Sequence, residues 1–396
     1  MSTPDAGGRT GLKTVSIIAT GGTIASGTGE KGLKPTYQLG EMLSELPGLD
    51  ELAVIRPHQL MNKDSSDMTP EDWVRIAVQA YKELQLADAV VITHGTDTMA
   101  YTSSMLSFML RNLDKPVILT GSQRPWAEPR SDAKTNLLDA VRVAVQAADH
   151  RLRGVYIVFH GKIIKGCRVK KSKYLEHSEL DAFDTINYPL IGLVKDTHLA
   201  VNPLLAMSPQ AEGGEPALDT RIDKRILMLT LTPGFDPTLL DSLRDRYQAI
   251  IIQAYGLGNM PITGKAAMVP HMKAWLDEGK IVAVTSQACY ETDLNQYETG
   301  RRFLELGIIP TLDMTQEAAY TKMMWALGQA NERGQVHDLM WTNMAGEIWP
   351  LNGNGRTLDI MGEMARYHDL TRRLYESNTQ LMEVMGTIFS KIKASR

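Results

Sequence analysis

The sequence predicts an α/β protein with two α/β domains, a larger N-terminal one and a smaller C-terminal one, followed by a helical extension. Three features support this interpretation: a length of 396 residues, short β-branched runs that alternate with longer helical patterns, and a break in that alternation near the middle. A chain of this length is long enough for more than one hydrophobic core. Strands that alternate with helices are typical of a parallel sheet covered by helices.

The first half of the chain contains runs that are apolar on both faces, as expected for strands covered by helices. These strands are predicted at residues 14–19, 89–93, 116–120 and 154–159. Between them, Thr69 suits the N-cap and Pro70 the first position of a helix. Two further helices are predicted over residues 99–112 and 132–148.

The alternation stops between about residues 199 and 223, where the sequence is rich in Pro, Gly and Ala. Such a stretch is typical of an interdomain connection. The predicted boundaries are an N-terminal domain at 1–200, a linker at 201–222, a C-terminal domain at 223–350 and an extension at 351–396. In the second domain, strands are expected at 225–231, 249–254 and 281–286, and helices at 237–247, 271–278 and 315–332.

The extension has apolar residues at helical spacing from Leu358 to Ile392, many of them methionines. Charged residues fall mostly between them, so the pattern predicts one or two amphipathic helices. We expect this face to dock on the parent domain or on a neighbouring subunit.

Composition limits the classes of partner and cofactor. The formal net charge is -4, which gives no reason to expect nucleic acid or an anionic membrane. Cys167 and Cys289 are too few and too far apart for a disulfide framework or a cysteine zinc site. His94 and His160 end strands and are interpreted as structural, so no metal is expected. The polar N-terminus and the lack of a long apolar run predict a soluble, cytoplasmic protein.

The first candidate site is the TGGTI loop directly after the first strand. Ligands bind beyond the carboxyl ends of parallel strands, and paired glycines leave backbone N–H groups free to point at one. Thr23 would then combine a nucleophilic hydroxyl with part of an oxyanion hole. No Gly-Lys-Ser/Thr follows, so a phosphate site fits poorly. A tight turn with a capping threonine is an equally good interpretation of this loop alone.

The second candidate site is the THGTDT segment, which follows another buried strand and opens a helix. A helix N-terminus stabilises negative charge, and Thr96 beside Asp97 places a hydroxyl and a carboxylate there. Asp97 is alternatively an ordinary carboxylate of a first helical turn.

Two further segments carry polar groups. Asp64, Ser65 and Ser66 precede the Thr69 cap, where they would grip a small polar ligand or simply form turn and cap hydrogen bonds. Lys171 lies in a basic cluster that is most often a solvated face. A buried lysine beside an aspartate would instead ease deprotonation of a hydroxyl.

Taken together, these loops resemble the bacterial-type L-asparaginase family, whose signatures are a TGGTI loop near the N-terminus and a later THGTDT segment. Both are present here, and the match continues through SSDMTPEDW, KPVILTGSQRP, FDTINYPLIG and AYGLGNMP, over roughly residues 13–350. The missing signal peptide and the SSDMTPEDW segment resemble the cytoplasmic type I branch.

The resemblance implies the asparaginase fold and hydrolysis of L-asparagine to L-aspartate and ammonia through an acyl-enzyme, with minor or no glutaminase activity. It implies no cofactor and no metal. It also implies a homo-oligomer, a dimer or tetramer, with active sites near subunit contacts.

The resemblance also implies the catalytic roles. Thr23 matches the attacking threonine, and Tyr37 matches the loop tyrosine that helps to activate it. Thr96, Asp97 and Lys171 match the group that handles protons and the hydrolytic water.

The implied substrate contacts surround this group. Backbone N–H groups around Gly22 and Thr96 would hold the oxyanion, while Asp97 binds the α-ammonium group. The α-carboxylate and leaving-amide contacts fall on the serines, and one contact comes from the second domain of a neighbouring subunit. These further positions are Asp64, Ser65, Ser66, the carbonyl of Ser122 and, from the second domain, Asn259.

Two rival functions remain. The asparaginase-like subunit of the archaeal-type transamidosome carries an additional N-terminal domain, whereas only residues 1–19 precede Thr20 here. A non-catalytic amino-acid-binding protein would be expected to lack a catalytic side chain, and none of the five is missing.

Overall fold

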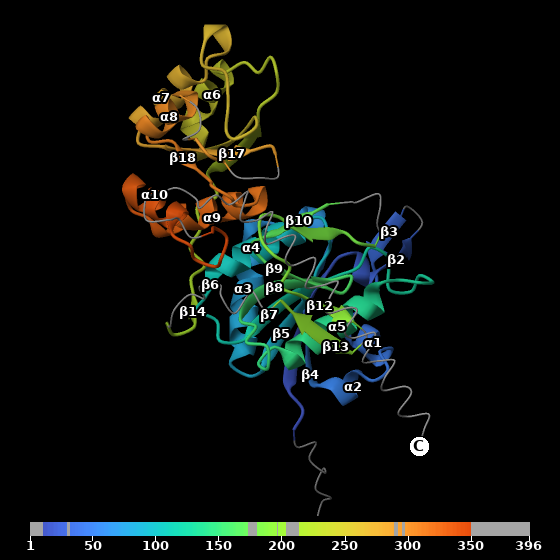
Figure 1. Cartoon of the computed structure of the whole chain (residues 1–396). Helices are drawn as coiled ribbons and strands as arrows, with labels where there is room; N and C mark the ends of the chain where they lie inside the picture. The colour runs from blue at the N-terminus through green and yellow to red at the C-terminus, as the bar shows by residue number, and fades with distance from the viewer. Residues whose placement is uncertain are drawn as a thin grey trace, which may run out of the picture.

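The computed structural model describes residues 11–29, 32–172, 180–195, 197–202, 214–288, 292–294 and 298–349. The predicted extension at 351–396 lies outside these residues. The two-domain α/β prediction is confirmed: in Figure 1 the blue-to-green N-terminal domain lies below the yellow-to-orange C-terminal domain. Within the described residues, no helix is both long and apolar enough to span a bilayer.

The N-terminal domain is built on an eight-stranded sheet. Its strands β4, β1, β5, β7 and β8 are parallel neighbours, and β9, β12 and β13 continue the sheet in antiparallel pairs. In the order of the sheet, the strands are β13 (His198–Val201), β12 (Gly192–Lys195), β9 (Lys162–Lys165), β8 (Gly154–Phe159), β7 (Pro116–Thr120), β5 (Ala89–Thr93), β1 (Thr14–Gly21) and β4 (Val54–Lys63).

The strands predicted as apolar on both faces are the buried ones. Three of them match the structure residue for residue, and the first continues to Gly21. The sequence did not predict β4, because it mixes exposed and half-buried residues and contains Pro57. These are properties of an edge strand.

Side chains that alternate along the strands build a separate core on each face of the sheet. Ile18 packs in the cluster that includes α3 and α4, whereas its neighbour Ile17 packs in the cluster that includes α1, α2 and α5. These helices are α1 (Leu39–Ser44), α2 (Leu49–Leu52), α3 (Pro70–Leu84), α4 (Met99–Met109) and α5 (Ala133–Gln146).

The helix starts were easier to predict than the helix ends. Thr69 and Asp72 form a capping box at the start of α3, with Pro70 in the first turn, as predicted. The helix predicted over 99–112 was too long: it stops at Met109, and Leu110–Arg111 form β6 instead. Strand β6 pairs with β14 (Ala217–Leu218). The backbone hydrogen bonds of these residues therefore go to a strand far along the chain and not to the helix.

Small hairpins and single 3₁₀ turns complete the N-terminal domain. None of the hairpins was predicted, because strands this short carry little periodicity. The hairpins are β2 (Ser26–Gly29) with β3 (Gly32–Pro35), and β10 (Val169–Lys171) with β11 (Phe183–Thr185); the 3₁₀ turns are η1 (Thr23–Ala25) and η2 (Ser65–Asp67).

The C-terminal domain has a four-stranded parallel sheet in the order β15-β16-β17-β18. The predicted strands at 249–254 and 281–286 match, and the helix predicted over 237–247 breaks into α6 and a 3₁₀ turn. The elements are β15 (Ile226–Thr230), α6 (Thr238–Leu243), η4 (Arg244–Arg246), β16 (Ala249–Ala254), η5 (Gly264–Ala266), α7 (Val269–Asp277), β17 (Ile281–Ser286), α8 (Glu298–Glu305), β18 (Ile309–Pro310), α9 (Gln316–Gln329) and α10 (Arg333–Trp341).

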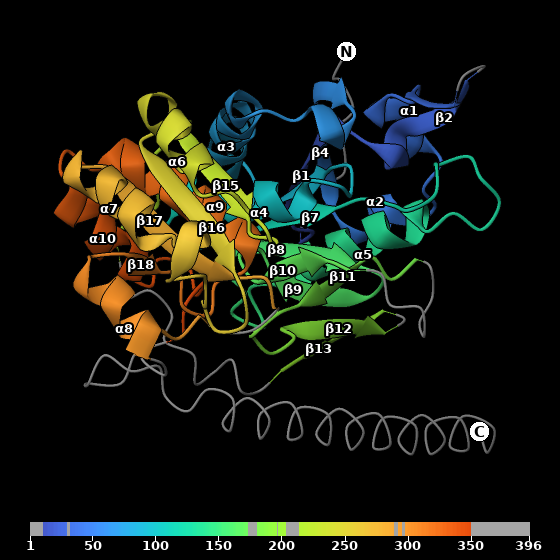
Figure 2. The same ribbon diagram turned by 90° about the horizontal axis from the view of Figure 1, so that it is seen from above.

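Helix α9 joins the two domains, and Figures 1 and 2 show it between the two sheets. It begins at the predicted position, because the Thr315 side chain accepts a hydrogen bond from the Ala318 N–H. Its Trp325 packs near Phe108 of α4, with ring centroids 6.5 Å apart. Both rings belong to one apolar cluster that runs through both domains.

A fully buried ion pair crosses the same junction. Arg168, just before β10, donates from Nη1 to Asp313 Oδ2 at 2.7 Å, and both side chains are 0% exposed. Arg168 Nε also donates to the carbonyl of Gly346 at 2.7 Å. The start of β10 is therefore anchored to the second domain.

We predict that Arg168→Met lowers the free energy of unfolding by about 3–5 kcal/mol, because it leaves Asp313 as a buried charge without its cation. The matched control is Arg302→Met, which removes an exposed arginine paired with Glu298 and should change stability by less than about 1 kcal/mol. Urea unfolding measures both. Equal losses for the two variants would contradict this account of the junction.

Candidate active site

The candidate site residues follow four adjacent strands at one edge of the large sheet. The order β7-β5-β1-β4 puts the loops after Thr120, Thr93, Gly21 and Lys63 side by side. The carboxyl edge of a parallel sheet is where ligands bind in α/β folds. The structure thus brings the TGGTI, THGTDT and DSS segments together at this edge.

The loops after β1 and β5 pack backbone against backbone. Gly22 has φ of +87°, and a Cβ atom there would lie 2.3 Å from both the Cα and the N of Gly95. Only glycine tolerates this backbone angle and this approach together. On its other side the Gly22 N–H donates to the carbonyl of Lys63 at 2.9 Å, which ties the loop to the end of β4.

Ser65 joins the third loop to the same centre. Its side chain is almost fully buried; its Oγ accepts a hydrogen bond from the N–H of Asp97 at 3.2 Å, and its carbonyl accepts one from Thr98 Oγ1 at 2.7 Å. A Cβ atom on Gly95 would lie 2.5 Å from the Ser65 hydroxyl. Ser65 therefore fixes where the THGTDT segment begins its helix.

The other residues of this loop face solvent. Asp64 accepts hydrogen bonds from the N–H and the hydroxyl of Ser66, both at 2.8 Å, and so caps η2. The backbone N–H of Ser66, followed by its hydroxyl, lowers the pKa of the Asp64 carboxyl. Ser66 is exposed and remains able to meet a ligand.

Lys171 of β10 reaches the THGTDT segment from far along the chain. Its Nζ donates to Thr96 Oγ1 at 2.8 Å and to Asp97 Oδ1 at 2.5 Å. The Thr96 side chain is buried, whereas the Asp97 carboxylate is 62% exposed and faces solvent. Lys171 itself is 33% exposed rather than buried, because β10 belongs to a short hairpin outside the large sheet.

A glutamine that the sequence did not single out completes this group. Thr96 Oγ1 donates to Gln123 Oε1 at 3.2 Å. The Asp132 carboxylate holds the loop that carries it, because it accepts hydrogen bonds from the N–H groups of Gln123 and Arg124. The one signal in the sequence was its place directly after Ser122, in the loop beyond β7.

Ser122 is fully buried beside Gln123, and its hydroxyl donates to the carbonyl of Arg124 at 2.5 Å. Its side chain is therefore occupied by the loop itself. The ligand contact that the resemblance implies for its backbone carbonyl stays a prediction, since the whole residue is 0% exposed.

Thr23 lies in the loop after β1, and the chain returns to this loop at Tyr37. Thr23 begins η1, and the N–H of Tyr37 donates to the carbonyl of Ala25 at 2.9 Å. Among the described residues no hydrogen bond joins the Tyr37 hydroxyl to Thr23. The structure brings Tyr37 to the loop, and its activating role stays a prediction.

Asn259 lies apart from these residues, in the turn after β16 of the C-terminal domain. It pairs with Tyr255 through both backbone groups, at 2.7 and 2.9 Å. Within the part of the chain that is described, it makes no hydrogen bond to the loops around Thr23. A role for Asn259 in a neighbouring subunit's site therefore stays a prediction.

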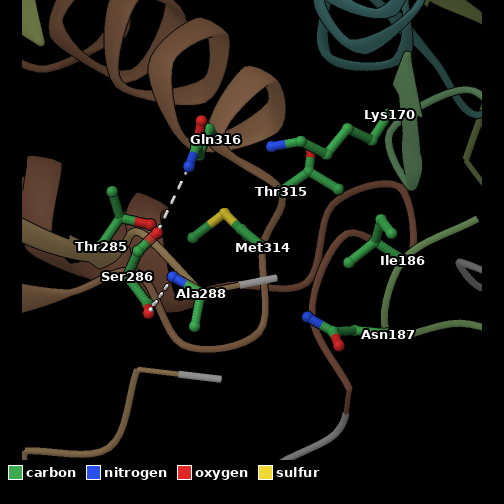
Figure 3. A pocket seen from close by; sticks show the side chains of 9 residues that line it. All are labelled: Lys170, Ile186, Asn187, Thr285, Ser286, Ala288, Met314, Thr315 and Gln316. Carbon is green, nitrogen blue, oxygen red and sulfur yellow. Dashed lines mark hydrogen bonds between the residues drawn. The ribbon is translucent and has the colours of Figure 1, made fainter. Parts of the chain in front are cut away.

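A separate small pocket lies between the domains, at the start of α9 (Figure 3). Successive residues of a strand face opposite sides, so Lys170 borders this pocket while Lys171 faces Thr96. None of the five proposed catalytic residues lines it. Its lining is Lys170, Ile186, Asn187, Thr285, Ser286, Ala288, Met314, Thr315 and Gln316.

The described residues contain no cluster of three or more His, Cys, Asp or Glu side chains able to hold a metal ion. What the strand ends gather is hydroxyls, a carboxylate, an ammonium group and backbone donors. These groups suit nucleophilic attack and proton transfer. The fold and the site together are those of an α/β hydrolytic enzyme.

Both domains of the chain match families of known proteins. Residues 14–205 match the family described as "Asparaginase, N-terminal", and residues 225–340 match "Glutaminase/Asparaginase C-terminal domain". The chain therefore belongs to the asparaginase family.

Individual relatives are similar over most of their length. The chain is 41% identical to an L-asparaginase of Thermococcus kodakarensis, over 84% of this chain and 98% of that protein. It is 39% identical to a glutamyl-tRNA(Gln) amidotransferase subunit of Pyrococcus furiosus, over 86% of this chain and 77% of that protein.

Solved structures agree with these matches. The thermostable L-asparaginase from Thermococcus kodakarensis superposes with a TM-score of 0.76 at 40% identity, covering 85% of this chain and 99% of that one. L-asparaginase I from Vibrio cholerae gives a TM-score of 0.76 at 30% identity, covering 86% and 100%.

We predict that Gly22→Ala lowers the free energy of unfolding by about 1–3 kcal/mol, because the added Cβ collides with backbone that has no room to move. Gly40→Ala is the control: it lies in α1, where an added Cβ meets nothing within 4 Å, and it should be neutral or slightly stabilising. Thermal and urea unfolding provide the comparison. If Gly22→Ala is as stable as Gly40→Ala, the close packing of the two loops is not what holds the site.

Proposed function

We propose that this protein hydrolyses the side-chain amide of L-asparagine to L-aspartate and ammonia. The observation that carries the proposal is the contact of Lys171 with Thr96 and Asp97, beside the loop that presents Thr23. A near full-length match to an L-asparaginase supports the same substrate.

In the proposed mechanism the Thr23 hydroxyl attacks the amide carbon, and its proton passes by way of Tyr37 to the amide nitrogen. The tetrahedral intermediate expels ammonia and leaves an aspartyl ester on Thr23. Water then attacks this ester, which releases aspartate and restores the threonine. Overall, the reaction consumes one water for each ammonia released.

The oxyanion would be held by backbone N–H groups. Among the described residues, the N–H groups of Thr23 and Thr96 have no acceptor, whereas that of Gly22 already donates to Lys63. We therefore assign the oxyanion contacts to Thr23 and Thr96, and we assign to Gly22 the role of bringing the loops together.

Thr96, Asp97 and Lys171 would act on the water. Because Lys171 donates to Thr96 Oγ1, the Thr96 proton is directed toward Gln123 Oε1. A second lone pair of the Thr96 oxygen stays available to accept a hydrogen bond from water.

The amino-acid part of the substrate would lie against Asp97 and the Ser65–Ser66 pair. The Asp97 carboxylate suits the α-ammonium group, and Ser65 with Ser66 suits the α-carboxylate. The Ser122 carbonyl would accept a hydrogen bond from the leaving amide.

A second candidate function is that of an amidotransferase component, favoured by the 39% identity to the Pyrococcus furiosus protein. The chain covers 77% of that protein, against 98% of the L-asparaginase. The purified chain alone distinguishes the two. Hydrolysis of free asparagine at an undiminished rate without tRNA or a partner supports our proposal, and strict dependence on either supports the alternative.

We further propose a cytoplasmic homo-oligomer, a dimer or tetramer, in which Asn259 approaches a neighbour's site. Light scattering on the purified protein gives the number of subunits. Cell fractionation gives the compartment.

We predict that Thr23→Val and Lys171→Met each lower kcat for asparagine by about three orders of magnitude, because each removes a reacting group with little change in volume. Groups that act as one unit fail together, so the double variant should be little worse than either single one. Ammonia release measures all three. Thr135→Val and Lys265→Met, both at exposed positions, serve as controls.

If either single variant keeps more than about a tenth of the wild-type kcat, its activation free energy has risen by less than roughly 1.4 kcal/mol. That residue then has no place in the proposed mechanism. Circular dichroism and melting temperature establish that each variant is folded.

We predict a preference for asparagine over glutamine of roughly 10- to 200-fold in kcat/KM, because a close-fitting pocket distinguishes one methylene by about 1–3 kcal/mol. Steady-state assays with both substrates measure the ratio. Equal kcat/KM for asparagine and glutamine would contradict a pocket that fits the shorter side chain closely.

A further inference from the structure

His94 is buried directly after β5 and contacts the same segment that carries Thr96. Its side chain is 0% exposed. The Nδ1 atom lies 2.7 Å from the carbonyl oxygen of Gly95, and Nε2 lies 2.9 Å from Thr102 Oγ1 of α4. The proposed mechanism gives this ring no function, and the sequence predicted only a structural one.

The hydrogen-bond partners fix where the protons are. A carbonyl only accepts, so Nδ1 of His94 carries a hydrogen and donates it to Gly95. At the other end, the Trp73 indole only donates, and it does so to Thr102 Oγ1 at 3.0 Å. The Thr102 hydroxyl is then free to donate to Nε2, which completes a chain of donors from Trp73 to the Gly95 carbonyl.

A neutral imidazole satisfies this chain at every atom. Burial lowers the pKa of His94 to about 4, so the ring is neutral near physiological pH. The ring therefore holds one fixed tautomer, with its hydrogen on Nδ1.

The anchored carbonyl belongs to the peptide bond that also supplies the Thr96 N–H. In a planar trans peptide the C=O and the N–H point in opposite directions. Anchoring the Gly95 oxygen on the buried imidazole therefore turns the Thr96 N–H away from the core. That N–H has no acceptor among the described residues.

We propose that His94 is a positioning residue for the oxyanion hole: its Nδ1–H holds the Gly95–Thr96 peptide so that the Thr96 N–H meets the oxyanion of the substrate. This inference rests on the proposed function. His94 would act through the planar Gly95–Thr96 peptide bond and would not itself contact the substrate.

Two substitutions separate positioning from packing. In His94→Asn the side-chain NH₂ takes the place of Nδ1 and keeps the donor to Gly95. In His94→Gln the NH₂ takes the place of Nε2 and that donor is lost. A packing role predicts that the larger glutamine is tolerated better, since it leaves the smaller cavity.

The positioning role predicts the opposite order. We expect His94→Gln to lower kcat by about 10²–10³-fold, as loss of an oxyanion donor does, with KM changed by less than about 3-fold. His94→Asn should keep kcat within about 10-fold of the wild type while melting at a lower temperature. Trp73→Phe, which leaves the bond to Gly95 intact, should lower the melting temperature and hardly change kcat. Equal kcat for the two His94 variants, or a better glutamine variant, would overturn the proposal.

A measurement without substrate tests the same geometry. Nitrogen-15 NMR of histidine-labelled protein, assigned with the His94→Asn variant, should show a neutral Nδ1–H tautomer of His94 across neutral pH. A neutral Nε2–H tautomer or an imidazolium would overturn the inference. If the tautomer is as expected and the wild-type protein fails to hydrolyse asparagine, the proposed function fails and His94 has no oxyanion hole to position.

Discussion

The close contact between Gly22 and Gly95 is the constraint on which the site depends. It sets the loop after β1 directly against the loop after β5, at a distance that no side chain would permit. Ser65 then fits against Gly95 and receives the Asp97 N–H, so a third loop takes its position from the same contact. The TGGTI loop, the Asp97 carboxylate and the serines are thus held relative to one another by backbone packing. Rigid placement of this kind is what a positioned nucleophile and oxyanion hole require.

The second domain contributes to the site indirectly. Lys171 is on β10, a short hairpin strand that the large sheet does not hold, and Arg168 at its start is bound to Asp313 across the domain junction. The lysine is thereby supported by a buried ion pair three positions before it. This gives a physical reason for two domains in a hydrolase whose proposed reacting groups all come from the first.

The sequence predicted those parts of the fold that depend on local pattern. The central strands are apolar on both faces, and α3 and α9 begin at threonine caps, so their positions could be read from the residues alone. The edge strand β4 and the hairpins could not, because β4 mixes exposed and half-buried residues and the hairpin strands are too short to carry periodicity. The same distinction applies to the site. The glycine-rich and polar loops stood out at strand ends, whereas the pairing of Lys171 with Asp97, separated by 74 positions, followed only from the resemblance. Gln123 was missed because an isolated glutamine after a strand carries no signal.

The most direct test of the account is identification of the covalent intermediate. Protein mixed with L-asparagine is quenched in acid within its first turnovers, digested, and analysed by mass spectrometry for an aspartyl ester. We expect an ester on Thr23 in the wild-type protein and none in the Thr23→Val variant. An ester on Thr96, or aspartate formation at the wild-type rate by the Thr23→Val variant, would contradict it.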